Sequence, residues 1–511
     1  MNLIEKIKHA RRAGVPIISI ATPDQPAIIK LITKAINGGT PMVTWDLVRG
    51  TNAANKAGEK VADMTGRGED DVTIGNPTKF LEICLAFPGA EEVPGTIAFM
   101  LNAQEFLLND KPGDSPAVLQ AISNLRDEFK MDGRTLVLLA PELKLPAAVK
   151  NDVVQLDDPL PDAKQLRELV VSLDKGVSGA NPGRKVLTSE LVDKAVEAVI
   201  GLSTFSAEQA IAMALRATGI DLEHLWANKI ATIQQTPGLS VFRNAGSFSD
   251  VGGLNNLKKY LTKIMEGRKA PKLVVWCDEI GTSGLANRSD LSGTNNDMEG
   301  TLLQFMQDKR VYGMMLAGAQ GAGKSEICKS VGGEYGRIVI RLDLEATKGG
   351  IVGQSGAQLR QALKVIEACG GEDILWIATA NRTDTLSGAM KNRFTDTFFF
   401  DLPNKEERDK VWQVWIKKFG LDDKPYTDDE GFNGRNIQQT CEKAFRMNCT
   451  IEEAAEWVTP VSEVDREGIE ELRTQADGRY LDASRSGTYW KASATKKPVR
   501  PVTDGVRKVN V

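Results

Sequence analysis

The sequence predicts an α/β protein in which two parallel sheets follow one another along the chain, before a small helical unit at the end. Two observations predict this fold class. Short apolar segments alternate with amphipathic helices over most of the 511 residues, which is typical of parallel sheets covered by helices. A glycine-rich loop at residues 318–325 lies between a predicted strand and a predicted helix, an arrangement typical of parallel α/β sheets. We assign this loop to the second sheet.

The first sheet is predicted within residues 1–170. Its elements are helix 4–14, strand 15–22, helix 25–38, strands 41–47 and 96–102, helix 118–129 and strand 134–141. The loop after the first strand reads TPDQPA (22–27) and lacks the glycines and the lysine with which a loop wraps phosphate. We therefore expect the first sheet to be catalytically inactive.

A helical subdomain and linker are expected at residues 171–245. Two stretches, 188–202 and 206–220, carry apolar residues at helical spacing. Residues 178–184 are expected to be a loop, and 236–250 a connector to the second half.

Composition excludes several classes of protein. The net charge of −4, from 64 basic and 68 acidic side chains, gives no global field that attracts nucleic acid or an acidic membrane. No apolar stretch approaches the length of a membrane span, and the basic-then-apolar N-terminus, which Pro16 interrupts, is interpreted as helix then strand, and not as a signal peptide. Only His9 and His224 occur, so a histidine-rich metal site is not expected. The scattered cysteines, without a CxxC pair, favour a reduced, cytoplasmic setting.

The strongest motif is the loop GAQGAGKS (318–325), which fits G-x-x-x-x-G-K-[ST]. The predicted strand 311–317 precedes it and the predicted helix 325–335 follows it, as the phosphate-binding mechanism requires. Backbone N–H groups would surround the phosphates of ATP, Lys324 would neutralise their oxygens, and Ser325 would bind Mg²⁺. The expected nucleotide-binding residues here are Gly318, Gly321, Ala322, Gly323, Lys324, Ser325 and Glu326.

An acid pair follows a short apolar run in VVWCDE (274–279). At a strand end, Asp278 would orient the metal and Glu279 would activate water. A buried strand capped by solvated acids is the alternative. Asp343 and Glu345 in IVIRLDLE are the rival candidates for the acid pair, but they are not adjacent. That stretch is better interpreted as the strand that follows the phosphate-loop helix. The segment after the acid pair leads into a helix over 298–310.

Two further polar residues lie beside predicted strands. Asn381 ends the apolar run DILWIATA, where its amide would orient the attacking water, although a turn-forming asparagine is the alternative. Arg393 precedes the apolar run that follows, a position suited to reach the γ-phosphate of a neighbouring subunit. A solvated arginine is the ordinary alternative.

These stretches resemble the AAA+ ATPases, specifically the FtsH-like branch and the AAA proteins first known as chloroplast-genome reading frames. The resemblance covers nearly the whole chain, including GSFSDVGGLNNLKKYL, the phosphate loop, ATAN, NRFTDTFFFDLPNKEER and PVSEVDREGIEELRTQADGRYLDAS. It implies a degenerate RecA-like domain at 1–170, an AAA+ core at 246–403, a helical lid at 404–485 and a basic, disordered tail at 486–511. The family also implies a homo-oligomeric ring, usually a hexamer, with ATP bound between subunits and hydrolysis driving the remodelling of a protein client.

Residue by residue, the resemblance assigns roles. Lys324 and Ser325 are similar to Walker A, Asp278 and Glu279 to Walker B, Asn381 to sensor 1, Arg393 to the arginine finger and Arg435 to sensor 2. Lys391 lies near a second finger arginine of many relatives, and Ile351-Val352-Gly353 stands where relatives carry an aromatic pore loop. The acid-pair strand precedes the phosphate loop here, whereas in relatives it follows.

This permuted order is compatible with an active site. With all strands parallel, the catalytic groups gather at the carboxyl edge according to strand position and not chain order. We expect strand 274–277 to lie between strand 338–343 and the strand before Asn381, with residues 281–297 and 308–312 making the new connections.

Two other classes of function stay open on the sequence. A nucleic-acid-associated motor or loader is one, because the basic tail (491–511) has the charge to contact phosphates. An ATP-gated scaffold with little turnover is the other. No membrane partner is expected, and the client is not identified.

Overall fold

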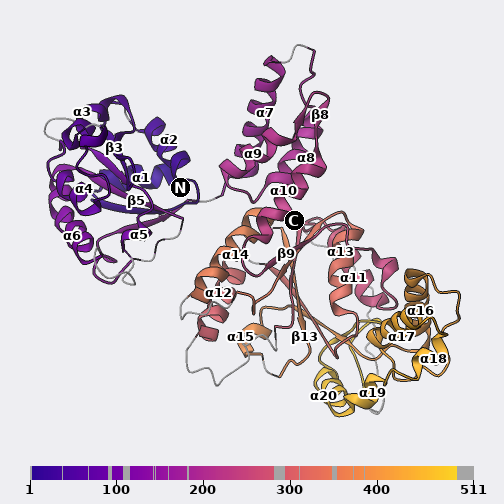
Figure 1. Cartoon of the computed structure of the whole chain (residues 1–511). Coiled ribbons are helices and arrows are strands. Elements are labelled where there is room, and N and C mark those ends of the chain that lie inside the picture. The colour runs from indigo at the N-terminus through magenta and orange to yellow at the C-terminus, as the bar shows by residue number, and fades with distance from the viewer. Residues whose placement is uncertain are drawn as a thin grey trace, which may run out of the picture. The chain divides into compact units, whose positions relative to one another are not determined.

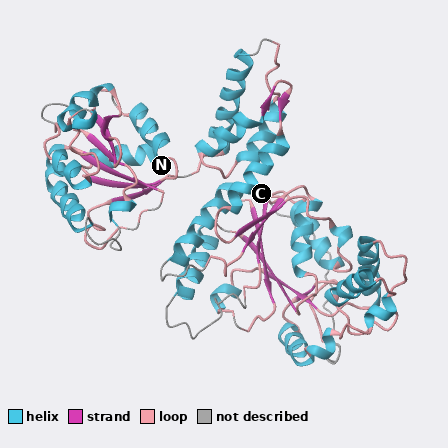
Figure 2. Cartoon of the chain, in the orientation of Figure 1, coloured by secondary structure: helices cyan, strands magenta, loops and turns pink. Residues whose placement is uncertain are grey.

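The computed structural model describes residues 3–491 except 37, 67, 90–94, 108–114, 142, 144, 159, 181–182, 281–293, 310, 348–353, 372 and 385 (Figure 1). Two compact units divide the chain, Met1–Trp226 and Ala227–Val511. Helices and strands alternate in both units (Figure 2), which confirms the predicted α/β class.

The first unit contains a six-stranded sheet in the order β3-β2-β4-β5-β1-β6, parallel except for the antiparallel pair of β2 and β3. Its elements are α1 (Leu3–Arg12), β1 (Ile17–Ala21), α2 (Gln25–Ala35), β2 (Met42–Asp46), β3 (Gly50–Ala53), α3 (Glu59–Ala62), α4 (Pro77–Cys84), β4 (Ile97–Met100), α5 (Gln104–Leu107), α6 (Ser115–Asp132), β5 (Thr135–Ala140) and β6 (Val154–Asp157). The helices and strands predicted up to residue 141 are confirmed.

Apolar residues fill both faces of this sheet. Successive strand residues point to opposite faces, so Ile17 packs with α4 and α6 while Ile18 packs with α1 and α2. The central strands β4 and β5 are therefore buried along their whole length, as expected for a sheet that helices cover on both sides.

The rest of the first unit is helical, with α7 (Ala163–Ala180), α8 (Ser189–Val199) and α9 (Thr204–Ala214) around one apolar core. The loop predicted at 178–184 starts too early, because α7 continues to Ala180. A small hairpin of β7 (Leu215–Arg216) and β8 (Gly219–Ile220) follows, and α10 (Leu222–Gln234) spans the boundary between the units.

The second unit contains a seven-stranded sheet in the order β15-β14-β11-β13-β10-β12-β9. Its elements are β9 (Leu239–Phe242), α11 (Asn255–Met265), β10 (Leu273–Cys277), α12 (Thr294–Asp308), β11 (Tyr312–Gly318), α13 (Lys324–Glu334), β12 (Ile338–Leu342), α14 (Gln354–Gly370), β13 (Ile374–Ala380), α15 (Gly388–Lys391), β14 (Asp396–Phe400) and β15 (Leu481–Asp482). α11 and α13 cover one face of the sheet. On the other face, Phe305 of α12 contacts Trp376 of β13, with ring centroids 5.9 Å apart.

Two predictions about the connections of this sheet are wrong. The connector predicted at 236–250 contains β9, which pairs antiparallel with β12 at the sheet edge, so not all strands are parallel. The alternation of buried Leu239 and Val241 with half-buried neighbours suits such an edge strand. The helix expected to start at residue 298 starts at Thr294, which shortens the predicted 281–297 connection.

Within the described part of the chain, five helices follow β14: α16 (Lys405–Phe419), α17 (Gly434–Met447), α18 (Ile451–Ala455), α19 (Val461–Val464) and α20 (Arg466–Ala476). This segment, where the sequence predicts a lid, is called the lid below. Asn404 and Asn433 start α16 and α17 by accepting hydrogen bonds from the backbone N–H groups of Glu407 and Asn436, which satisfies donors that a helix start leaves free. After α20 the chain returns to the sheet, where β15 pairs with β14. Among the helices within the described ranges, none is long and apolar enough to cross a membrane.

Candidate functional site

Three strands of the second sheet end at one edge with the residues singled out in the sequence. β10 pairs in parallel with β12 on one side and β13 on the other, and β13 pairs with β11. The position predicted for the acid-pair strand is therefore confirmed. Because carboxyl ends of parallel strands meet at one edge, Asp278 and Glu279 after β10, the glycine-rich loop after β11 and Asn381 after β13 converge.

The glycine-rich loop connects β11 to α13, which begins at Lys324. Gly321 and Gly323 have φ angles of +75° and +88°, a region that side chains strongly disfavour. A Cβ on Gly321 would also lie 2.6 Å from Cβ of Arg435 and 2.7 Å from Nδ2 of Asn433. Glycine is therefore required here both by the backbone conformation and by the close approach of the lid.

Lys324 is a buried cation at the centre of the site. Its ammonium group donates hydrogen bonds to the carbonyl oxygens of Gly318 at 2.6 Å and Ala319 at 2.7 Å, and to Oδ1 of Asn381 at 2.8 Å. Burial lowers the pKa of Lys324 to about 8, and the nearby Glu279 and Asp278 act in the opposite direction. A buried cation beside a glycine-rich loop is a group that an anionic ligand stabilises.

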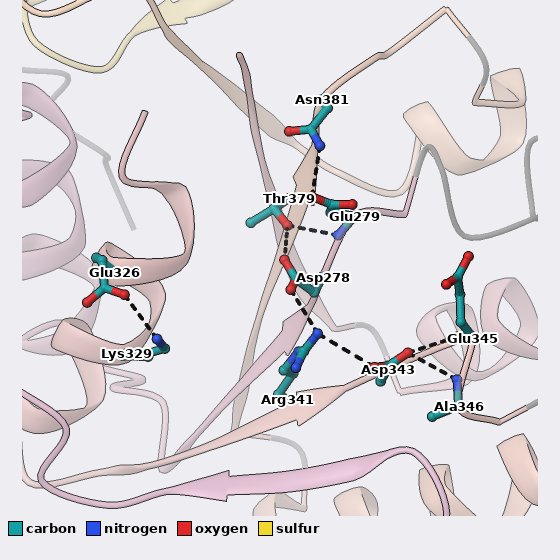
Figure 3. A network of polar contacts seen from close by, with 10 residues as sticks. All are labelled: Asp278, Glu279, Glu326, Lys329, Arg341, Asp343, Glu345, Ala346, Thr379 and Asn381. Carbon is teal, nitrogen blue, oxygen red and sulfur yellow. Dashed lines mark hydrogen bonds and ion pairs between the residues drawn. The ribbon is translucent and has the colours of Figure 1, made fainter. Parts of the chain in front are cut away.

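The acid pair is held by Thr379 of β13 and by Asn381, which directly follows this strand (Figure 3). The Thr379 hydroxyl donates to Oδ1 of Asp278 and accepts from the backbone N–H of Glu279, both at 2.9 Å. Nδ2 of Asn381 donates to Oε1 of Glu279, also at 2.9 Å. Glu279 has a φ angle of +49°, and such strained backbone is concentrated at functional sites.

A cavity of about 1000 Å³ opens at this edge, which is enough for a nucleotide. Its wall includes Asp278, Glu279, Asn381, Arg435 and the loop and helix residues Gly321, Ala322, Gly323, Lys324, Ser325 and Glu326. The Ser325 hydroxyl and the Asp278 carboxylate are oxygen donors, which Mg²⁺ prefers, so the residues present fit this metal. The side chain of Glu326 forms an ion pair with Lys329 at 3.0 Å.

The rival acids are placed elsewhere. Neither Asp343 nor Glu345 is among the residues that line the cavity. Oδ1 of Asp343 accepts hydrogen bonds from the backbone N–H groups of Glu345 and Ala346 (Figure 3), an arrangement typical of an Asx turn. This geometry favours the acid pair after β10.

Arg393 does not lie at this edge. It precedes β14, and its neighbour Thr395 donates a backbone hydrogen bond to the carbonyl of Gly313, near the start of β11. The Arg393 guanidinium contacts Oε1 of Gln307 at 2.6 Å. A whole strand therefore separates Arg393 from the phosphate loop of its own chain, a distance of roughly 17–20 Å.

The lid contributes contacts that the sequence motifs did not indicate. Asn433 donates through Nδ2 to the carbonyl of Gln320 at 2.7 Å, and the backbone N–H of Arg435 contacts the Gly321 carbonyl at 3.3 Å. Apolar side chains of α16, including Val411 and Trp415, form another part of the cavity wall. Thr379 and Arg341 were also missed, because a threonine or arginine inside a strand carries no motif signal.

The first sheet lacks such a site at the corresponding place. Only residues 22–24 connect β1 to α2, whereas the longer segment 319–323 connects β11 to α13. Asn102 follows β4 by the same offset as Glu279 follows β10, and its φ angle is +51°. There Gln25 and Asn102 bond each other reciprocally, at 2.8 and 3.1 Å. A short loop and this amide pair occupy the place of a phosphate-binding loop.

Two predicted features lie outside the described residues. These are the pore-loop candidate Ile351-Val352-Gly353 and residues 492–511 of the basic tail. Lys391, by contrast, is placed at the end of α15.

Comparison with known proteins finds likeness to AAA ATPases. Residues 3–157 match the family model of the SpoVK-like AAA ATPase, N-terminal domain. The uncharacterized AAA domain-containing protein ycf46 of Guillardia theta is 24% identical, covering 93% of this chain and 95% of that protein. The ycf46 protein of Pyropia yezoensis is 22% identical, covering 95% and 100%. A putative 26S proteasome regulatory subunit homolog of Methanocaldococcus jannaschii is 26% identical over 38% of this chain and 56% of that protein.

The close contact at Gly321 gives a first testable prediction. Gly321→Ala should weaken nucleotide binding at least tenfold, because the new methyl group meets Arg435 and Asn433 and the residue must keep a positive φ angle. Gly300→Ala, in α12 with open space around its Cβ position, is the matched control and should bind as the unmodified protein. Calorimetric titration with ATP measures both, and equal affinities would contradict the tight packing between loop and lid.

Proposed function

We propose that the chain is an ATP hydrolase that uses Mg²⁺ and acts as a ring. The observation that carries this proposal is the convergence of Lys324, the acid pair and Asn381 at one sheet edge, although these residues come from separate parts of the chain. Each is the residue type that phosphoryl transfer needs at its position.

Each residue has a proposed role in the reaction. Backbone N–H groups of residues 321–324 and the Lys324 ammonium group bind the phosphates, and Lys324 exchanges its hydrogen bonds with the Gly318 and Ala319 carbonyls for phosphate oxygens. Mg²⁺, held by Ser325 and oriented by Asp278, would neutralise charge that develops on the phosphate oxygens. Glu279 polarises the attacking water. Asn381, which is hydrogen-bonded to Glu279, orients this water. Arg435, from the lid, faces the same cavity.

We further infer that the second sheet is a permuted form of the fold, and the first sheet supports this. In space, β2-β4-β5-β1-β6 corresponds to β12-β10-β13-β11-β14. Along the chain the first set occurs as β1, β2, β4, β5, β6, so the corresponding order in the second sheet is β11, β12, β10, β13, β14. Only β10, with its helix α12, is out of numerical order. A strand and its helix have thus moved ahead of the phosphate loop.

The ring and its client belong to the same proposal. Arg393 lies a strand length from the phosphate loop of its own chain, so a role in hydrolysis requires the nucleotide of a second copy. We infer a homo-oligomeric ring, for which the resemblance to AAA+ ATPases implies a hexamer, and remodelling of a protein client as its output. The likeness to a proteasome regulatory subunit homolog supports a protein client over nucleic acid.

One experiment tests the core of this proposal. Calorimetry with the full chain should give at most one ATP per chain, because the first sheet has no phosphate-binding loop, and Lys324→Ala should abolish binding. Steady-state phosphate release should be present in the unmodified protein and absent in Lys324→Ala. Two nucleotides per chain would contradict the inactive first sheet. Binding without phosphate release would support an ATP-gated scaffold instead.

A further inference from the structure

Arg341 on β12 contacts the carboxylate that we assign to metal orientation. β12 is the neighbour of β10, and Arg341 pairs in register with Trp276, two residues before Asp278. The Arg341 guanidinium approaches Oδ2 of Asp278 at 3.1 Å and Oδ2 of Asp343 at 3.5 Å. Figure 3 shows Arg341 between the two carboxylates.

Packing holds the Arg341 guanidinium in place. Its central carbon lies 5.4 Å from the centre of the Trp276 ring, within the range of a cation–π contact. The side chains of Arg341 and Asp278 are 34% and 19% exposed, so solvent screens their attraction only in part. This pair is therefore stronger than an ordinary surface ion pair.

Both oxygens of Asp278 are engaged. Thr379 donates to Oδ1, and Arg341 contacts Oδ2. Lys324 instead bonds the loop carbonyls and Asn381. Within the described residues, Arg341 is thus the cation in ion-pair contact with the Asp278 carboxylate, at the place where a divalent cation would arrive.

We propose that Arg341 is the resting counter-ion of Asp278 and sets the Mg²⁺ concentration that nucleotide binding requires. This inference rests on the proposed ATPase function. A fixed positive charge against the metal-orienting carboxylate repels an incoming divalent cation, so Mg²⁺ binds only together with the negative charge of the nucleotide phosphates. Because Arg341 also contacts Asp343, its attraction to Asp278 is weaker than it would be with Asp278 as its sole partner.

The test is the Mg²⁺ dependence of binding of a non-hydrolysable ATP analogue, measured by calorimetry. Arg341→Gln should lower the Mg²⁺ concentration for half-maximal binding by about fivefold or more, since it removes a charge a few ångströms from the metal position. Arg341→Lys, which keeps the charge, should stay near the unmodified value. Arg446→Gln, which removes an exposed charge on the lid paired with Glu442, is the matched control.

A second variant gives the opposite sign and carries the test if Arg341→Gln does not fold. Asp343→Asn removes the charge of the second carboxylate that contacts Arg341. Arg341 then interacts more strongly with Asp278, so the Mg²⁺ concentration for half-maximal binding should rise. An unchanged or raised requirement in folded Arg341→Gln would overturn the inference, and so would an unchanged or lowered one in Asp343→Asn. If the unmodified protein binds no analogue at any Mg²⁺ concentration, the proposed function itself fails. Magnesium-dependent binding that the Arg341 and Asp343 variants do not shift would overturn only the inference on Arg341.

Discussion

Glu279→Gln should reduce steady-state ATP hydrolysis by about 10²-fold or more while ATP and Mg²⁺ still bind, in the range expected when a general base is lost. The glutamine amide keeps the size of the side chain and its contact with Asn381, but it cannot polarise water. Phosphate release measures the loss, and calorimetry checks that binding is retained.

Matched variants separate the acid pair from its rival. Glu345→Gln and Asp343→Asn, assayed at saturating Mg²⁺, should leave hydrolysis nearly unchanged, because neither residue lines the cavity. A crippling effect of Asp343→Asn together with a nearly silent Glu279→Gln would reverse the assignment and remove the basis for a permuted active site. Asp278→Asn, in contrast, should weaken metal-dependent nucleotide binding as well as turnover.

Arg393→Ala should bind ATP normally and hydrolyse it on the order of 10³-fold more slowly, the scale on which an arginine supplied in trans accelerates phosphoryl transfer. Within its own chain Arg393 contacts Gln307, at the edge opposite the phosphate loop. If Arg393→Ala loses activity but still binds ATP, Arg393 therefore acts on the nucleotide bound to a neighbouring subunit. Phosphate release and calorimetry provide the two readouts.

Mixing variants identifies the direction of this contribution. Arg393→Ala mixed with Lys324→Ala should recover part of the activity, because the second variant offers its intact Arg393 to the intact nucleotide site of the first. Arg393→Ala mixed with a chain that carries both substitutions should recover none. Full activity in a proven monomer, with no recovery on mixing, would exclude the ring.

Local pattern was sufficient for most elements. The run IISIA and the stretch DILWIATA became β1 and β13, and the loop GAQGAGKS lies between β11 and α13 as predicted. The prediction failed where pairing decides the structure. β9 carries only four residues of strand pattern, and its place in the sheet depends on β12, which lies far along the chain. The start of α12 at Thr294 also precedes its first strong apolar signal.

The amino-acid sequence by itself determined the fold class, the glycine-rich loop, the acid pair and the lack of glycines and lysine in the first loop, because each depends on residue types at short spacing. The place of β10 between β12 and β13 was expected from the resemblance and is confirmed by the strand pairing. Only the tertiary structure decided that Arg341 and Thr379 hold Asp278, that Asn433 contacts the glycine-rich loop, and that Arg393 lies at the opposite edge. The physical reason is that strand neighbours are chosen by burial and hydrogen bonding across the whole sheet. Contacts between residues far apart in the chain therefore leave no local pattern that could predict them.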